Sequence, residues 1–199
     1  MLERAEEWFD SPLYIHLARH PCGMIRSYVE ANLHEEMRIR FRLGGPSPFA
    51  PRQMAELVWT IAHQNIEQFL AGVPAERQHR LRFEDLVRQP EATMRGICGF
   101  LDLEFQTEMI LPYEHPERKM VDGVTVHDRM DGDQKFRFVH RSIDPRVADA
   151  WQEGMSGDFL GSPARELAAR LGYDGLPEPS WSEDSGQGAI ELAAPAADG

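Results

Sequence analysis

The stretch LYIHLARHPCGMIRSY, residues 13–28, joins a β-strand pattern directly to a helix pattern. Its apolar first half is typical of a largely buried strand, in which only His16 needs a polar partner. Pro21 suits the first turn of a helix, because the N–H that proline lacks has no intrahelical partner there. We therefore predict a strand over 13–18 and a helix over 21–34.

The rest of the chain continues this alternation. Apolar residues recur at helical intervals over 51–69, which predicts the clearest amphipathic helix of the chain. By similar signals we expect a strand at HRLRF, residues 79–83, and helices that start at Pro90, after Asp144 and after Ser162, the last ending at Gly172. Strands that alternate with helices indicate an α/β fold with a parallel sheet. Because two strands make a poor sheet for so many helices, we expect part of the domain to lie upstream of Met1.

The last part of the chain has a different composition. Residues 174–199 contain six acidic side chains and no Lys or Arg, and they are rich in Pro, Gly, Ser and Ala without sustained periodicity. We predict a folded domain over 1–173 and an acidic disordered tail over 174–199. The net charge of −12 of the whole chain argues against broad nucleic-acid binding, which depends on many Lys and Arg contacts to phosphate.

The residue types and their spacing give expectations about the location of the protein, its cysteines and metal binding. No apolar run approaches the roughly 20 residues that cross a bilayer, and the first twelve residues are too acidic for a signal peptide, so we expect a cytoplasmic protein. Cys22 and Cys98 lie far apart and are expected to be buried thiols. The acidic group in HDRMDGDQK, which includes Asp128, lacks the spacing of an EF-hand, so we predict no metal.

Polar residues gather where the first strand ends. At the carboxyl end of a parallel strand, Arg19 would point into the crevice where α/β proteins hold ligands. Its guanidinium can bind a phosphate by two charge-assisted hydrogen bonds, and the Ser27 hydroxyl can add a third donor. With the helix N-terminus, these groups would form an anion pocket. The alternative is that Arg19 pairs with a surface carboxylate and Ser27 faces solvent.

Two stretches resemble a known family. Arg19-His20-Pro21, with Ser27 eight residues after the arginine, resembles the 3′-phosphate-binding motif of sulfotransferases. LRFEDLVRQPEATMRGICGFLDLEF, residues 81–105, is similar to a family segment in which a strand ends in an aromatic-Glu-Asp-Leu motif. The likeness spans residues 13–173. It is greatest to bacterial sulfotransferase domains, including those of modular polyketide synthases, where sequences like ELVWTIAHQNI and IDPRVADAW also occur.

This resemblance implies a fold, a donor and site residues. The fold would be a P-loop-NTPase-like parallel sheet with flanking helices, incomplete at its N-terminal side. The sulfonate donor would be 3′-phosphoadenosine 5′-phosphosulfate, with Arg19 and Ser27 on its 3′-phosphate. Phe83 stands where many members carry a tyrosine near the adenine and would give apolar contact without the hydroxyl. His63, within WTIAHQNI, is the candidate general base; the alternative is a structural hydrogen-bonding residue of the helix.

Two parts of the family pattern are missing from the sequence. The glycine-rich loop that surrounds the 5′-phosphosulfate is not recognisable, and no G-x-x-x-x-G-K-[ST] run occurs. The late Lys-Gly-rich phosphate loop is also not recognisable, although DQKFRFVHRSIDPRVADAW occupies about the right place. Lys135, Arg137 or Arg141 could therefore approach the 3′-phosphate, or each could be an ordinary exposed cation.

These observations leave more than one function open. The leading hypothesis is a sulfotransferase whose hydroxyl acceptor is a small molecule or an acyl chain linked to a carrier protein, with no nucleic-acid or membrane partner. The alternative is a truncated or degenerate domain that binds a nucleotide or a partner without catalysis, since half a cofactor site cannot orient a sulfonate. A P-loop kinase is disfavoured, because it needs a phosphate-binding Lys and a magnesium-binding Ser or Thr. The oligomeric state is open.

Overall fold

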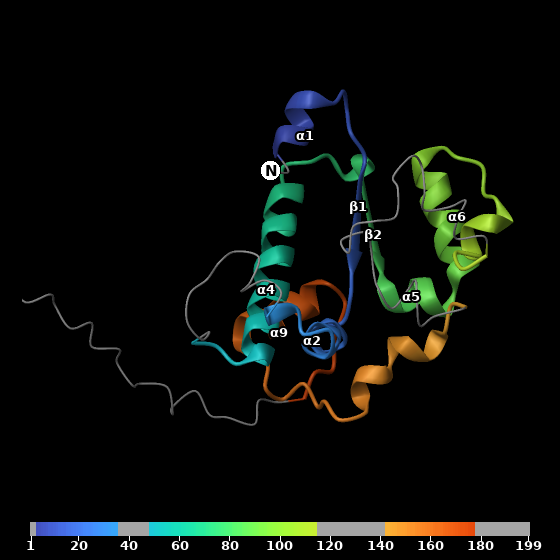
Figure 1. Cartoon of the computed structure of the whole chain (residues 1–199). Coiled ribbons are helices and arrows are strands. Elements are labelled where there is room, and N and C mark those ends of the chain that lie inside the picture. Colours follow the sequence, from blue (N-terminus) through green and yellow to red (C-terminus); the bar gives the residue numbers. More distant parts are fainter. Residues whose placement is uncertain (1–2, 36–47, 115–141, 178–199) are drawn as a thin grey trace, which may run out of the picture.

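The computed structural model of the protein describes residues 3–35, 48–114 and 142–177. Within them, β1 (Tyr14–Ala18) and β2 (Gln78–Arg82) pair in parallel, with Tyr14 opposite Gln78 and Ala18 opposite Arg82 (Figure 1). The α-helices are α1 (Glu3–Trp8), α2 (Pro21–Glu30), α4 (Pro51–Leu70), α5 (Phe83–Arg88), α6 (Pro90–Leu101) and α9 (Ser162–Arg170). Short 3₁₀ turns are η1 (Ala75–Arg77), η2 (Thr107–Ile110), η3 (Pro145–Ala148) and η4 (Ala150–Gln152).

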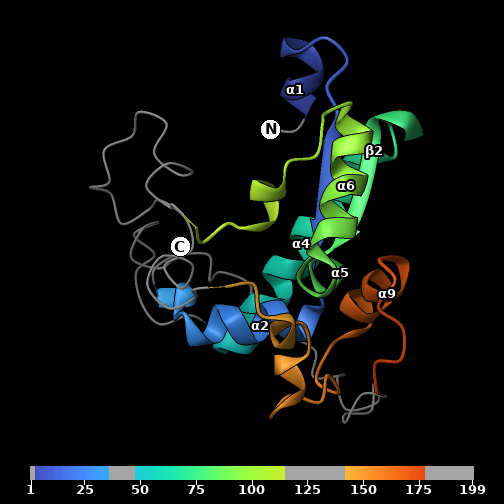
Figure 2. The same ribbon diagram turned by 90° about the vertical axis from the view of Figure 1, so that its right-hand side faces the viewer.

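The two strands lie between helical layers, which confirms the predicted α/β fold. Figure 1 shows α4 on one side of the strands and α6 on the other, and the quarter turn of Figure 2 brings α6 to the front. On the α6 side, the rings of His79 and Phe100 stack with centroids 5.2 Å apart. On the α4 side, the ring of Tyr14 meets that of Phe69 edge-on at 5.1 Å.

The prediction that β1 is largely buried was wrong for half of its side chains. His16 and Ala18 face α4 and are 4% and 0% exposed. On the opposite face, Leu13, just before the strand, Ile15 and Leu17 are 43%, 44% and 47% exposed. An apolar run predicts a strand covered on both faces, but among the described residues the face with Leu13, Ile15 and Leu17 is left open.

The core lies between α2, α4 and α9. Figure 1 shows α2 and α9 beside the first half of α4. The side chains of Ile25, Trp59 and Leu167 are at most 1% exposed there, and the thiol of Cys22 is buried with them. Cys98 is buried as well, so both cysteines are buried thiols as predicted. Leu176 packs against this core although it belongs to the segment predicted as a tail; residues 178–199 lie outside the described residues.

Helices α2, α4 and α6 start at the predicted prolines, and Gly172 follows α9 with a φ of +84°. Helix α2 ends at Glu30 instead of residue 34. Three further features differ from the predictions. Phe83 starts α5 instead of ending β2. The Asp144 carboxylate caps its turn as predicted, by accepting the N–H of Arg146 at 2.9 Å, but two 3₁₀ turns follow instead of an α-helix.

The third difference concerns Ser162. This residue is the first of α9, not its cap. The position before it is Gly161, whose N–H donates to the Glu56 carboxylate of α4 at 2.7 Å. A side chain from another helix therefore satisfies the backbone at this terminus, which local sequence cannot predict.

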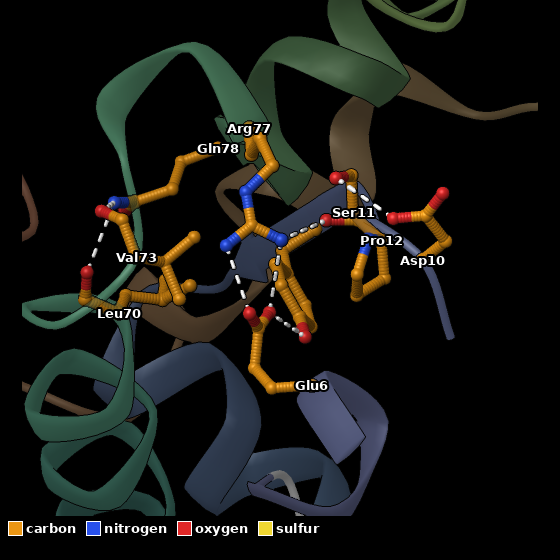
Figure 3. A network of polar contacts seen from close by, with 9 residues as sticks. Glu6, Asp10, Ser11, Pro12, Leu70, Val73, Arg77 and Gln78 are labelled. Atoms are coloured by element: carbon orange, nitrogen blue, oxygen red, sulfur yellow. Dashed lines mark hydrogen bonds and ion pairs between the residues drawn. The ribbon is translucent and has the colours of Figure 1, made fainter. Parts of the chain in front are cut away.

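At the amino end of the strands, α1 is joined to the sheet by exposed polar groups. Figure 3 shows Glu6 facing Arg77, whose two terminal nitrogens lie 3.0 and 2.8 Å from the two carboxylate oxygens. Arg77 also donates to the Pro12 carbonyl at 3.1 Å, and the Gln78 amide donates to carbonyls at the end of α4. In the described parts of the chain, no helix has the length and hydropathy needed to span a membrane.

Candidate functional site

Polar and aromatic side chains from both strand ends meet at the carboxyl edge of the sheet. Arg19 and His20 follow β1, and Phe83 and Glu84 follow β2. The Arg19 guanidinium lies over the Phe83 ring, 4.5 Å from its centroid. Parallel strands present their carboxyl ends to the same side, so two segments 64 residues apart in sequence contribute to one site. The structure thus brings together two of the predicted site residues, Arg19 and Phe83.

Helix α2 runs close to the Arg19 side chain. A Cβ atom on Gly23 would lie 3.3 Å from the Arg19 Nε atom, so the arginine lies against bare backbone. Ser27 follows Gly23 by four residues and therefore shares this face of α2, one turn further along. It is half-buried. Arg19 therefore lies against the face of α2 that carries Ser27, and the anion pocket itself stays a prediction.

The ring of His20 is buried in an aromatic stack. It lies parallel to the Trp151 ring, with centroids 4.0 Å apart and planes at 8°, and it meets the Tyr173 ring edge-on at 5.3 Å. Burial lowers the pKa of His20 to about 4, so the imidazole is neutral at physiological pH. Its buried Nδ1 atom has no hydrogen-bond partner among the described residues.

Trp151 was not among the predicted site residues. Two arginines bind the backbone and side chain of the residues that precede it. Arg26 of α2 donates to the Ala150 carbonyl, and Arg88 of α5 lies 2.7 Å from both carboxylate oxygens of Asp149. These contacts join η3 and η4 to both halves of the carboxyl edge. The stretch IDPRVADAW was the sequence signal for Trp151. It was part of the family resemblance, but no role was assigned to its tryptophan.

Glu84 is a second residue that the sequence analysis missed. It is 6% exposed, and its Oε1 accepts the backbone N–H of His20 at 2.9 Å. Its Oε2 accepts the Tyr173 hydroxyl at 2.8 Å, and burial together with this carboxylate raises the pKa of Tyr173. Its signal was the acidic residue directly after Phe83 in the FEDL motif.

His63 is a buried residue of α4, one turn after Trp59. Its Nδ1 atom is 2.9 Å from Nε2 of His16, and its ring meets the Trp59 ring edge-on at 4.9 Å. Burial and the neighbouring His16 lower the pKa of His63 to about 4. In these contacts His63 joins α4 to β1, and the structure does not bring it beside the Arg19 guanidinium. Its role as a base stays a prediction.

The other predicted candidates cannot be placed. Lys135, Arg137, Arg141 and the acidic group around Asp128 lie outside the described residues. Within the described residues, no three His, Cys, Asp or Glu side chains are grouped so as to hold a metal ion.

Comparison with known proteins gives the family. The model of the family described as "Sulfotransferase family" matches residues 2–107, just over half of the chain. The chain belongs to the sulfotransferase family. The resemblance found in the Arg19-His20-Pro21 and FEDL motifs is thereby confirmed.

Two solved sulfotransferase domains have a similar structure. The sulfotransferase domain from the curacin biosynthetic pathway is 34% identical, and the match covers 88% of this chain and 58% of that chain at a TM-score of 0.68. The sulfotransferase domain from the Synechococcus PCC 7002 olefin synthase is 30% identical, with 88% and 54% covered at the same TM-score. The chain therefore spans less than three fifths of the length of these sulfotransferases. None of the curated proteins matches it.

Proposed function

We propose that this protein acts in the transfer of a sulfonate from 3′-phosphoadenosine 5′-phosphosulfate to a hydroxyl acceptor. Arg19 and Ser27 bind the 3′-phosphate, and Phe83 contacts the adenosine. One observation carries the proposal: Arg19 lies at the carboxyl edge between the Phe83 ring and the face of α2 that carries Ser27. This combines a charged donor, a hydroxyl donor, a helix N-terminus and an aromatic surface, the chemistry that a nucleotide phosphate needs.

The residues present fit the nucleotide half of this donor. The guanidinium is stacked on an aromatic ring, which limits its orientations while its N–H groups lie in the plane that a phosphate approaches. The donor supplies an activated sulfonate: its S–O bond to the 5′-phosphate breaks as the acceptor oxygen bonds to sulfur. The acceptor proton needs a base, and His63 is the residue proposed for it.

Calorimetry tests the nucleotide site directly. The 199-residue chain is titrated with adenosine 3′,5′-bisphosphate and with adenosine 5′-monophosphate, which lacks the 3′-phosphate. Replacing Arg19 by Ala should weaken binding of the bisphosphate by about 2 to 4 kcal/mol, as for a lost charged hydrogen bond, and leave the monophosphate unchanged.

The matched control is Arg95→Ala. Arg95 also lies over an aromatic ring, 4.1 Å from the centroid of Phe105, but on α6. This variant should bind both nucleotides like the wild type. Equal losses for both nucleotides in Arg19→Ala would contradict the assignment of the 3′-phosphate to Arg19.

The base is tested separately. His63→Gln should lower turnover and leave nucleotide affinity nearly unchanged if His63 accepts the acceptor proton. His16→Phe is the control, because it keeps a ring but removes the hydrogen-bond partner of His63 and not the proposed base. Loss of turnover in both variants to the same extent would assign the pair a structural role instead.

For the acceptor, we propose a hydroxyl on an acyl chain linked to a carrier protein. Both similar structures come from biosynthetic systems, the curacin pathway and an olefin synthase, and this origin supports the choice. Carrier-linked hydroxyacyl chains and the corresponding free alcohols are offered with labelled donor. Transfer to the free alcohols alone would contradict the proposal.

Nucleotide binding without transfer is the second candidate. The specific observation that favours it is the place of the proposed base, because His63 is hydrogen-bonded to His16 between α4 and β1. A chain that binds the bisphosphate through Arg19 but transfers no sulfonate to any acceptor would have this function. Transfer that is lost with Arg19→Ala would exclude it.

A further inference from the structure

The peptide group between Arg19 and His20 is hydrogen-bonded at both of its polar atoms by side chains. The Arg19 carbonyl accepts the indole N–H of Trp59 at 3.0 Å. The His20 N–H donates to the Glu84 carboxylate at 2.9 Å. This peptide lies between the last residue of β1 and the first of α2. Side chains from α4 and α5 therefore supply the partners at the point where strand and helix meet.

Glu84 is itself held by a third segment. The hydroxyl of Tyr173, a buried residue three positions after α9, donates to its second oxygen at 2.8 Å. Both donors to the carboxylate are neutral, so the 6%-exposed Glu84 has no cation as a hydrogen-bond partner among the described residues. Arg82 and Arg88 interact with Glu84 electrostatically, but the hydrogen bonds to its carboxylate come from the neutral donors. Burying a carboxylate is unfavourable compared with an apolar side chain. Such a residue is better explained by the precise geometry that its charge-assisted hydrogen bonds impose.

This geometry acts on Arg19. Because a peptide group is planar, fixing its N–H and C=O directions restricts ψ of Arg19 and φ of His20, and with them the direction of the Arg19 side chain. The neighbour of Glu84 in α5, Phe83, lies under the guanidinium at 4.5 Å. Two adjacent residues of α5 therefore act on Arg19. Phe83 lies beneath its guanidinium, and the Glu84 carboxylate accepts the backbone N–H of the next residue, His20.

We propose that Glu84, held by Tyr173, is a positioning residue that orients Arg19 toward the 3′-phosphate of the nucleotide, with Trp59 acting on the other atom of the same peptide. This inference rests on the proposed function. It assigns to the glutamate of the FEDL segment a part in selecting 3′-phosphorylated nucleotides, although the carboxylate contacts no phosphate itself.

The experiment measures selectivity instead of stability. For each variant, calorimetry gives the ratio of the Kd for adenosine 5′-monophosphate to the Kd for adenosine 3′,5′-bisphosphate. Glu84→Ala should lower this ratio at least about tenfold, the scale of one lost charged hydrogen bond. Glu84→Gln keeps the length of the side chain and an acceptor for the His20 N–H, so the backbone geometry is retained and the ratio should stay within about threefold of the wild type.

Two further variants separate positioning from folding. Tyr173→Phe is milder, because it removes one hydroxyl and keeps the ring; it should lower the ratio about threefold, and it decides the question if Glu84→Ala does not fold. Glu56→Ala is the matched control. It also removes a carboxylate that accepts a backbone N–H, that of Gly161 at 2.7 Å, and it should leave the ratio unchanged.

A double-mutant cycle shows whether Glu84 acts through Arg19. In the Arg19→Ala background, Glu84→Ala should have no further effect on the ratio, because the side chain to be positioned is gone. An additional loss in that background, or equal losses for both nucleotides, would overturn the inference. A wild-type chain with no preference for the bisphosphate would overturn the proposed function and this inference together. A preference that Arg19→Ala abolishes, but that Glu84→Ala and Tyr173→Phe leave intact, would overturn only the inference.

Discussion

Two glutamates at opposite ends of the sheet each accept a hydrogen bond from a tyrosine, but their surroundings differ. At the amino end, Glu6 accepts from Tyr14 and pairs with Arg77, and its side chain is 36% exposed (Figure 3). At the carboxyl end, Glu84 accepts from Tyr173 and from a backbone N–H, and the residue is 6% exposed.

The difference shows that the contribution of a hydrogen-bond network to stability depends more on its burial than on the number of its bonds. Solvent reaches the Glu6 carboxylate, whose side chain is 36% exposed, so its ion pair with Arg77 is screened and contributes little to stability. Water does not reach the donors that face Glu84, so removal of the carboxylate leaves them unpaired. Two networks of the same residue types therefore serve different purposes. One joins α1 to the sheet, and the other fixes the backbone beside Arg19.

The largest expected effect tests this contrast by removing each carboxylate. Glu84→Leu should lower the free energy of unfolding by about 3 kcal/mol, because it leaves the His20 N–H and the Tyr173 hydroxyl buried without acceptors. Urea denaturation of this variant beside Glu6→Leu measures the difference. Adding Tyr173→Phe to Glu84→Leu removes one of the unpaired donors and should restore part of the loss. Equal destabilisation by the two leucine variants would break the comparison.

The second effect concerns how the stability of the protein changes at acid pH. Burial lowers the pKa of His20 to about 4, so between pH 6.5 and 4 the folded protein binds fewer protons at this residue than the unfolded chain does. The contribution of His20 is complete above pH 6.5 and is lost as the pH falls toward 4, by up to about 3 kcal/mol at that end. His20→Phe keeps a ring against Trp151 and removes the titration, so urea midpoints measured across this range should depend less on pH.

The amino end serves as the control for this pH profile. Hydrogen bonds from Arg77 and Tyr14 lower the pKa of Glu6 below its ordinary value of 4.5. Its stabilising contribution is therefore present above pH 4.5 and is lost only as the pH falls through the lowered pKa. Glu6→Gln should leave the profile between pH 6.5 and 4.5 unchanged. An equal flattening of that range by Glu6→Gln and His20→Phe would contradict the assignment to His20.

The third prediction concerns a substitution at the carboxyl edge of the sheet that should change nucleotide affinity without lowering stability. In Gly23→Ala, the new Cβ lies 3.3 Å from the Arg19 Nε atom, so the guanidinium must shift. Alanine stabilises a helix by up to about 1 kcal/mol relative to glycine, so the urea midpoint should rise or stay level. The affinity for adenosine 3′,5′-bisphosphate should nevertheless fall several-fold. Gly99→Ala, on α6 with open space around the new Cβ, is the control and should leave affinity unchanged.

The smallest effect is expected for the exposed ion pair itself. Glu6→Gln should produce a slight decrease in the urea midpoint in low salt that disappears in 1 M NaCl, where charges are screened within about 3 Å. The corresponding exchange Glu84→Gln should depend less on salt, because Glu84 is buried and both of its hydrogen-bond donors are neutral, although Arg82 and Arg88 also interact with it electrostatically. Salt dependence of the same size in both variants would contradict the comparison.

Several features could be predicted from local sequence. Pro21, Pro51 and Pro90 start helices because proline lacks the N–H that the first turn leaves unpaired. The motif around Arg19 was sufficient for the family, and the structure places that arginine at the end of a strand and over Phe83. The exposure of Ile15 could not be predicted in the same way, since it depends on which helices cover each face of the sheet.

The sequence by itself determined the two strands and the helices that start at Pro21, Pro51 and Pro90, which residues can carry charge, and the family, because these depend on neighbours within a few positions. Only the tertiary structure decided which carboxylate is buried. Glu6 and Glu84 both precede apolar or acidic neighbours in the chain, and nothing local distinguishes them. Glu84 meets the His20 N–H, 64 residues away, and the Tyr173 hydroxyl, 89 residues away, because parallel strands end at one edge and α9 packs beside it. Contacts between such distant segments set the geometry at Arg19.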